Sequence, residues 1–306
     1  VGPLERSGLP PGVDAAFRVD EEFRGSKFRL WVEPGGQVVK EEGPLGLVLV
    51  REIGARAAMS GVDRGAGLDV GALAAIPVNR PIDSPRELSE LALRVSGAAA
   101  HGGGNLALSF PPRQTFAAGR LRIEREDRSE LSSYELPARD PGLAADLAAT
   151  PFLQIEDREV RDASREALGA ERDAAKGAEK LLDWVFRAVA KAPVPSVPNA
   201  RDVLRDRRGD CNEHAVLYAA LARAAGLPAR VVAGTVYMPG DDGSPAGFYY
   251  HAWNEVWLGR WVTVDPTFGQ FPADATHVKL IEGGPETHAR LLAMIGKLEL
   301  EVVEAR

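Results

Sequence analysis

The chain holds one cysteine, Cys211, within the stretch RRGDCNEHA at residues 207–215. The following residues repeat apolar side chains at helical spacing, so we expect a helix over residues 213–225, with Asp210 or Gly209 as its N-cap. Cys211 then falls at or just before the first helical turn. The unpaired N–H groups and the positive dipole end of a helix stabilise a thiolate and bind an oxyanion. The position therefore suits a nucleophile, although an unpaired cysteine by itself is more often a buried structural residue.

A cysteine nucleophile needs a base and a third group that orients the base. His251 lies in the stretch YYHAWNEVWLGRWVTVDPT, whose alternation predicts two antiparallel strands. Asp265 ends the second of these strands, immediately before a proline. The two residues supply an imidazole and a carboxylate for such a site. Taken singly, His251 fits an aromatic core strand and Asp265 a turn cap equally well.

The length of the loop between these strands decides whether the two side chains meet. A two-residue loop puts Asp265 on the face opposite to His251. A three-residue loop, 258–260, pairs Trp257 with Trp261 and makes Asp265 the diagonal neighbour of His251 on one face. We therefore expect an odd-numbered loop or a bulge at this hairpin, and with it a Cys–His–Asp arrangement.

The other four histidines fit the role of base less well. His101 lies in a glycine-rich loop, and His277 and His288 fall in the polar C-terminal segment. His214 follows Cys211 by three residues on the expected helix, which is too close to aim its imidazole at the thiol and leave room for a substrate. We expect His214 to serve the helix terminus or the packing.

Two long blocks, RRGDCNEHAVLYAALARAAGLPARVVAGTVY and YYHAWNEVWLGRWVTVDPTFGQF, closely resemble the transglutaminase-like superfamily. The hallmarks are a cysteine after Gly-x at a helix start, a strand with HAW.EVW and a strand that ends in W..VDPT, in this order. The resemblance covers roughly residues 150–300. It implies a papain-like core in which the nucleophile helix packs on an antiparallel sheet. It also implies Cys211 as nucleophile, His251 as general base and acid, and Asp265 as the residue that orients His251.

The composition and periodicity of the sequence predict an α+β protein in three parts. Residues 1–20 are rich in Gly and Pro and lack periodicity, which is typical of a flexible leader. Residues 21–147 form a β-rich accessory domain, because alternating runs flank EPGGQ like a hairpin and ELSELALRVSG and GRLRIERED are strand-like. From about residue 148 the composition turns helical, and residues 148–306 are expected to form the transglutaminase-like catalytic domain, beginning with an amphipathic helix that ends before PVPSVPNA.

Composition excludes several classes of protein. A net charge of −7 and a pI near 5.4 argue against nucleic acid or an anionic membrane as main partner. No apolar run is long enough for an integral membrane segment. One cysteine allows neither an internal disulfide nor a CxxC zinc site. We predict no metal and no cofactor, and read GDDG at 240–243 as a solvated turn rather than a calcium site. Scarce cysteine favours an exported, periplasmic or membrane-tethered protein over a cytoplasmic one.

Substrate contacts are harder to assign from the sequence. Asn199, in the loop before the cysteine, is a candidate for the second oxyanion donor, with a turn residue as the alternative. Tyr249, Trp253 and Trp257 share the face of His251 and are candidates for lining a cleft, although aromatic residues on a sheet face more often form core.

The expected reaction is acyl transfer on protein or peptide amides through a thioester, as in a transglutaminase or deamidase. A papain-like cysteine peptidase or amidase would use the same scaffold and residues, because fold and triad do not separate these activities. A third alternative is a non-enzymatic interaction module, against which the complete set of catalytic residue types argues.

Overall fold

The computed structural model describes the ranges 2–6, 8–10, 12–23, 26–42, 48–51, 75–97, 108–192, 198–240, 244–284, 291 and 298–306. His101, His288 and residues 241–243 of the GDDG stretch lie outside these described residues. The chain divides into two compact units, Val1–Leu73 and Ala74–Arg306.

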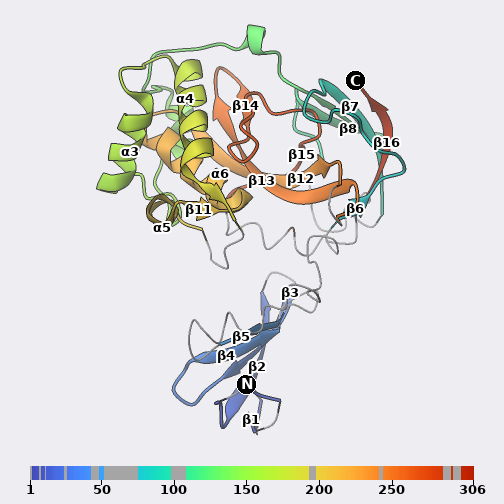
Figure 1. Cartoon of the computed structure of the whole chain (residues 1–306), viewed down its shortest axis with the longest axis vertical. Coiled ribbons are helices and arrows are strands. Elements are labelled where there is room, and N and C mark those ends of the chain that lie inside the picture. The colour runs from blue at the N-terminus through green and yellow to red at the C-terminus, as the bar shows by residue number, and fades with distance from the viewer. Residues whose placement is uncertain are drawn as a thin grey trace. The chain divides into compact units, whose positions relative to one another are not determined.

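The first unit is one antiparallel sheet whose strands follow in chain order (Figure 1). The strands are β1 (Leu4–Glu5), β2 (Ala16–Phe23), β3 (Ser26–Val32), β4 (Val38–Glu42) and β5 (Val48–Val50). The hairpin predicted around EPGGQ is present, since β3 pairs with β4 and Gly36 has a φ of 84°. Residues 1–20 are not a separate leader, because Leu4 pairs with Phe17 and Ala16 is buried beside Trp31.

The second unit is built around an antiparallel sheet of order β14–β13–β12–β15, with β6 paired to β13. Its strands are β6 (Ile76–Pro77), β12 (Ala229–Met238), β13 (Gly247–Trp257), β14 (Trp261–Val264) and β15 (Val278–Glu282). The loop between β13 and β14 has three residues: Trp257 pairs with Trp261, and Gly259 takes a φ of 76°. The odd-numbered loop expected from the sequence is thus confirmed.

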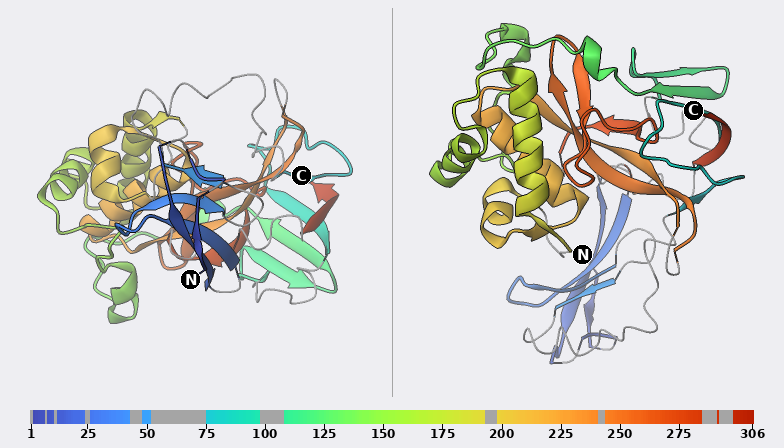
Figure 2. Two further views of the ribbon diagram at one scale, coloured as in Figure 1. Left: turned by 90° about the horizontal axis from the view of Figure 1, so that it is seen from below. Right: turned by 45° about the horizontal axis from the view of Figure 1, so that its top comes forward.

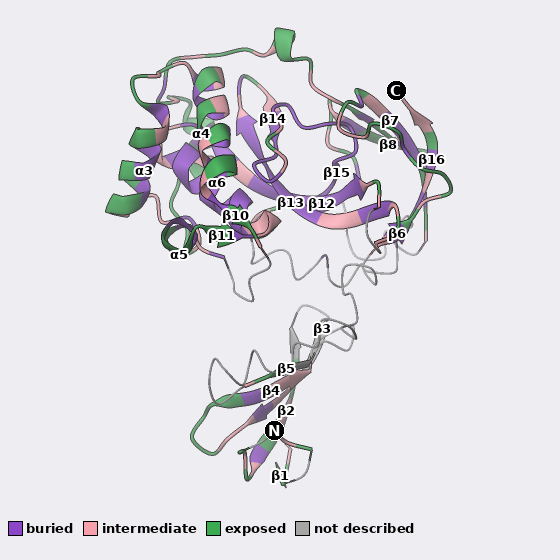
Figure 3. Ribbon diagram, in the orientation of Figure 1, coloured by how far each residue is buried: buried purple, intermediate pink, exposed green. Residues whose placement is uncertain are grey.

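Four helices gather at one end of this sheet (Figures 1 and 2). They are α3 (Arg158–Leu168), α4 (Ala174–Ala188), α5 (Ala200–Asp206) and α6 (Cys211–Ala224). Each of α3 and α4 has an exposed outer face, whereas α6 is buried over most of its length (Figure 3). The Asn254 amide of β13 donates to the Ala215 carbonyl at 2.9 Å, which ties α6 to the sheet. The predicted α+β class, a helix bearing the cysteine packed on an antiparallel sheet, is confirmed.

A second antiparallel sheet, of order β16–β7–β9–β8, belongs to the same unit. Its strands are β7 (Glu90–Ser96), β8 (Gln114–Ala117), β9 (Arg120–Glu124) and β16 (Glu299–Ala305). The strands expected in ELSELALRVSG and GRLRIERED are β7 and β9. Because β7 pairs with the C-terminal strand β16, the compact units divide at residues 73 and 74 rather than at 147 and 148. Among the described residues, no helix has the length and apolarity needed to cross a membrane.

Candidate active site

The first turn of α6 holds Cys211 in a fixed position. Asp210 is the N-cap and accepts the Asn212 N–H at 2.9 Å, while the Glu213 carboxylate accepts the Asp210 N–H at 2.9 Å. This reciprocal capping box defines where the helix begins. Gly209 is required beside it, because a Cβ at this position would lie 2.1 Å from the Cβ of Glu213. The GDC motif therefore presents the partly exposed thiol of Cys211 at a helix start.

His251 joins Cys211 to Asp265. Nε2 of His251 lies 2.9 Å from Oδ2 of Asp265, and the side chain of Cys211 lies close enough to the imidazole to raise its pKa. Since Nε2 is used by Asp265, Nδ1 is the ring nitrogen that remains to interact with the thiol. Burial lowers the pKa of His251, but the Asp265 carboxylate and Cys211 raise it by more than burial lowers it. The resulting pKa is about 9. The structure thus brings the three predicted catalytic residues together, with an imidazole that favours its protonated form.

Asp265 is a buried carboxylate that accepts four hydrogen bonds. Oδ1 accepts the backbone N–H groups of Thr267 at 2.7 Å and Phe268 at 3.0 Å. Oδ2 accepts from His251 and from a second histidine, His277, each at 2.9 Å. Burial raises the pKa of Asp265, but the two histidines outweigh it and hold the pKa far below its ordinary range. Asp265 is therefore ionised at neutral pH.

Two aromatic rings fix the plane of the His251 imidazole. Phe268 stacks on it with centroids 4.9 Å apart and an interplanar angle of 11°. Trp253 stacks at 6.0 Å and 20°. The stacked rings still allow the imidazole to rotate within its own plane. The hydrogen bond from Nε2 to Asp265 prevents this rotation. The nitrogen that faces Cys211 is thus positioned before any substrate arrives.

His277 and Phe268 are site residues that sequence reasoning missed. His277 was expected in a polar C-terminal segment, yet it is fully buried against Asp265. The one local signal is the DATH stretch, where Asp274 caps a turn by accepting the Thr276 N–H at 2.8 Å. A capped turn predicts a bend, but not which side chain the bend brings inward.

The predicted substrate residues lie away from this arrangement or beneath it. Asn199 is the N-cap of α5 and bonds Asp202 through both side-chain atoms, so it is a turn residue rather than an oxyanion donor. Trp253 is 1% exposed and forms core under His251, because the sheet face that carries it is covered. Trp257 lines a different hollow with Tyr134, six residues along β13 from His251. Tyr249 is partly exposed and its hydroxyl donates to the Pro245 carbonyl at 2.6 Å.

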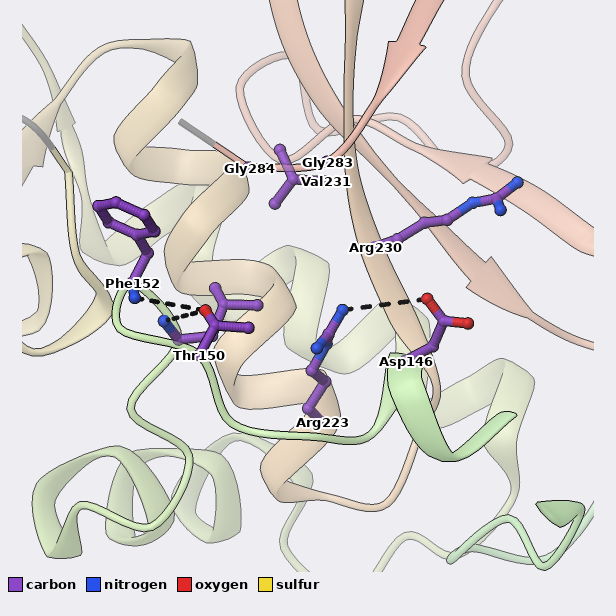
Figure 4. A pocket seen from close by; sticks show the side chains of 9 residues that line it. Asp146, Thr150, Phe152, Arg223, Arg230, Val231, Gly283 and Gly284 are labelled. Atoms are coloured by element: carbon purple, nitrogen blue, oxygen red, sulfur yellow. Dashed lines mark hydrogen bonds and ion pairs between the residues drawn. The ribbon is translucent and has the colours of Figure 1, made fainter. Parts of the chain in front are cut away.

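A cavity of about 160 Å³ lies at the opposite end of α6 (Figure 4). Arg223 lines it, twelve residues and roughly 18 Å along the helix from Cys211. Its guanidinium donates to the carbonyls of Ala148 at 2.7 Å and Ala229 at 2.8 Å, and Arg230 pairs with Glu255 at 2.6 Å. Both cations are bonded to groups of the fold and stabilise the walls of the cavity. The cavity therefore lies apart from the site around Cys211.

A helix with a cysteine at its N-terminus, packed on an antiparallel sheet that bears a histidine and an aspartate, is the architecture of a papain-like cysteine enzyme. Residues 161–266 match the family model of the Transglutaminase-like superfamily, so this part of the chain is similar to that superfamily. The resemblance stated from the sequence motifs is thus confirmed.

Two curated relatives match part of the chain. A protein-glutamine gamma-glutamyltransferase of Pseudomonas aeruginosa is 39% identical over 97 residues, which are 28% of this chain and 14% of that protein. Kyphoscoliosis peptidase of Mus musculus is 37% identical over 83 residues, which are 26% of this chain and 12% of that protein. The chain therefore spans a small part of the length of either relative. Among solved structures, the periplasmic domain of TgpA from Pseudomonas aeruginosa is 19% identical with a TM-score of 0.35, covering 66% of this chain and 91% of that one.

Proposed function

We propose that the chain is a cysteine-dependent acyl-transfer enzyme that acts on protein or peptide amides through a thioester on Cys211. One observation carries the proposal: His251 is hydrogen-bonded to the ionised Asp265 and lies close enough to Cys211, at the start of α6, for that side chain to raise the pKa of its imidazole. This is the geometry of nucleophile, base and orienting group that covalent catalysis requires.

In the first half-reaction the Cys211 thiolate attacks the carbon of a carboxamide, and its proton resides on His251. The carbonyl oxygen becomes an oxyanion at the start of α6. Capping bonds use the N–H groups of Asp210, Asn212 and Glu213, so we assign the Cys211 N–H to stabilise this oxyanion. His251 then gives its proton to the departing nitrogen, the C–N bond breaks, and ammonia or an amine leaves the thioester behind.

In the second half-reaction an amine or water attacks the thioester carbon. His251, now neutral, removes the proton from the attacking group, and the C–S bond breaks to return the thiolate. Asp265 stays ionised throughout and stabilises the imidazolium each time it forms. An amine acceptor gives a cross-linked amide, whereas water gives deamidation or hydrolysis.

The second candidate is a papain-like cysteine peptidase or amidase that cleaves peptide bonds. The matching region is shared with a relative named as a transferase and with one named as a peptidase, which supports both reactions. The chemistry of the two reactions differs only in the leaving group and the acceptor. A non-catalytic module is less well supported, since a buried carboxylate bonded to an imidazole beside the cysteine is the arrangement that covalent catalysis uses.

An exported or periplasmic location stays a proposal, which cell fractionation would test.

The test combines a glutamine-containing protein with a labelled primary amine and follows the products over time. Amine incorporation or glutamate formation that depends on Cys211 supports transglutaminase or deamidase activity. Backbone cleavage that depends on Cys211 supports the peptidase. A Cys211→Ala variant with the same circular dichroism as the wild type is the control, and equal product formation by this variant would contradict the proposal.

A further inference from the structure

His277 lies between two carboxylate residues in the buried interior behind the triad. Its Nε2 is 2.9 Å from Oδ2 of Asp265. Its Nδ1 is 3.2 Å from the carbonyl oxygen of Asp274 and 3.4 Å from Oδ1 of the same residue. His277 and both aspartates are fully buried. Every polar partner of its ring is therefore an acceptor.

Counting donors and acceptors assigns the protons of this ring. Asp265 is ionised, so its oxygen accepts and Nε2 of His277 must carry a hydrogen. Nδ1 faces only a carbonyl and a carboxylate oxygen, so it must carry a hydrogen as well. Two N–H groups make the ring an imidazolium. Beyond it, Arg86 pairs with Oδ2 of Asp274 at 3.1 Å.

From this geometry we propose that His277 is a positioning residue of the active site: as an imidazolium held between Asp265 and Asp274, it anchors the Asp265 carboxylate and limits how strongly that carboxylate attracts the proton of His251. This inference rests on the proposed roles of Cys211 and His251. The charges then alternate in sign from Arg86 through Asp274, His277, Asp265 and His251 to the thiolate of Cys211. Alternation makes each neighbour attractive, which lets a row of ionic groups stay buried.

Aromatic contacts reinforce the same row. Trp253 meets the His277 ring edge-on at 5.2 Å and 79°, and stacks on His251. The Arg86 guanidinium lies 4.3 Å over the ring of Phe268, which also stacks on His251. Arg86 therefore reaches His251 by two routes, one through Asp274 and one through Phe268.

Nitrogen and oxygen atoms of His251, Asp265 and His277 lie within 4.8 Å of one another, a spacing that could also hold a metal ion. A metal would need Nε2 of both histidines without hydrogen. Each nitrogen is instead at hydrogen-bond distance from the Asp265 carboxylate. The protonation state of the two Nε2 atoms therefore distinguishes a metal site from the hydrogen-bonded row of charged side chains.

The direct test is a long-range ¹H–¹⁵N spectrum of the chelator-treated full chain at pH 7.5. Comparison with His277→Gln identifies the His277 ring. Two protonated nitrogens are the expected result, and a ring with one unprotonated nitrogen would overturn the proposal. This experiment needs no turnover, so it stays informative if the proposed reaction is wrong.

The positioning role is tested by the rate of Cys211 alkylation with iodoacetamide as a function of pH. His277→Gln can still donate to Asp265 but carries no charge, so His251 should hold its proton more strongly. We expect the alkaline limb of the profile to move upward by half a pH unit or more. Tyr218→Phe is the control, because it removes a buried hydrogen bond to the Ala178 carbonyl without touching the row. A folded His277→Gln protein whose profile overlays that of the wild type would refute the role.

Discussion

Nε2 of His251 lies 2.9 Å from Oδ2 of Asp265, although the two residues are not opposite each other in their hairpin. Regular pairing of β13 with β14 ends where Asn254 meets Val264. Asp265 comes next and turns the chain, exchanging backbone hydrogen bonds with Gln270 at 3.0 Å in both directions. The carboxylate is thus held by a turn at the strand end and reaches diagonally to the imidazole. The relay depends on the loop length as much as on the residue types.

Removing the charge of Asp265 should disable the base without unfolding the protein. Asp265→Asn keeps the size of the side chain but cannot stabilise the His251 imidazolium. We expect kcat/KM to fall on the order of 10³–10⁴-fold, as for other enzymes in which this carboxylate becomes an amide. Steady-state kinetics with an amide substrate would measure it. Asp157→Asn, which alters the N-cap of α3, is the matched control, and a change of less than about threefold in Asp265→Asn would speak against the relay.

The glycine opposite His251 should tolerate no side chain. Gly234 pairs with His251 across β12 and β13, at the bulge where β15 joins. A Cβ there would lie 1.9 Å from the Val278 carbonyl oxygen and 3.0 Å from Trp253. We expect Gly234→Ala to lower the free energy of unfolding by about 1–3 kcal/mol, since β15 must move.

Because Val278 adjoins His277, activity should fall together with this stability. Chemical denaturation and kinetics would measure both. Gly35→Ala is the comparison, because a Cβ at Gly35 meets nothing within 4 Å. Equal midpoints and equal activities for the two variants would show that the close approach at Gly234 is unimportant.

The raised pKa of His251 gives stability a pH dependence of definite sign. Its folded value, about 9, lies above the ordinary 6.5. The protonated ring therefore stabilises the fold fully below about pH 6.5, and this contribution is lost as the pH rises through about 9. We expect the free energy of unfolding to fall more steeply between these pH values in the wild type than in His251→Gln. Denaturant titrations at several pH values would measure it, and parallel slopes would count against the raised pKa.

Local signals in the sequence predict a large part of the candidate site. The capping residue Asp210 and the apolar spacing after it place Cys211 at a helix start, because a helix needs its first N–H groups satisfied. The strict alternation of β13 and β14 makes face and register a matter of counting. For this reason the three-residue loop and the diagonal approach of Asp265 to His251 can be predicted from the sequence.

Long-range pairing and turn chemistry account for what could not be predicted. β7 and β16 are about 200 residues apart, and neither strand carries a local sign of its partner. Phe268 follows the end of β14 and His277 precedes β15, and turns capped by Asp265 and Asp274 decide which of these side chains point inward. Periodicity does not extend into such turns. From the sequence, Trp253 could line a cleft or form core on its sheet face. The packing of other elements over that face makes it a core residue.

The central claim is that Cys211 forms an acyl-enzyme, and mass spectrometry of the intact protein tests it most directly. The full chain is mixed with glutamine-containing and other amide donors, quenched in acid within the first turnovers, and digested to locate any adduct. We expect a thioester on Cys211 that accumulates in the wild type, is weaker in Asp265→Asn and is absent in Cys211→Ala. No adduct on Cys211 from any amide donor, with products still formed, would contradict it.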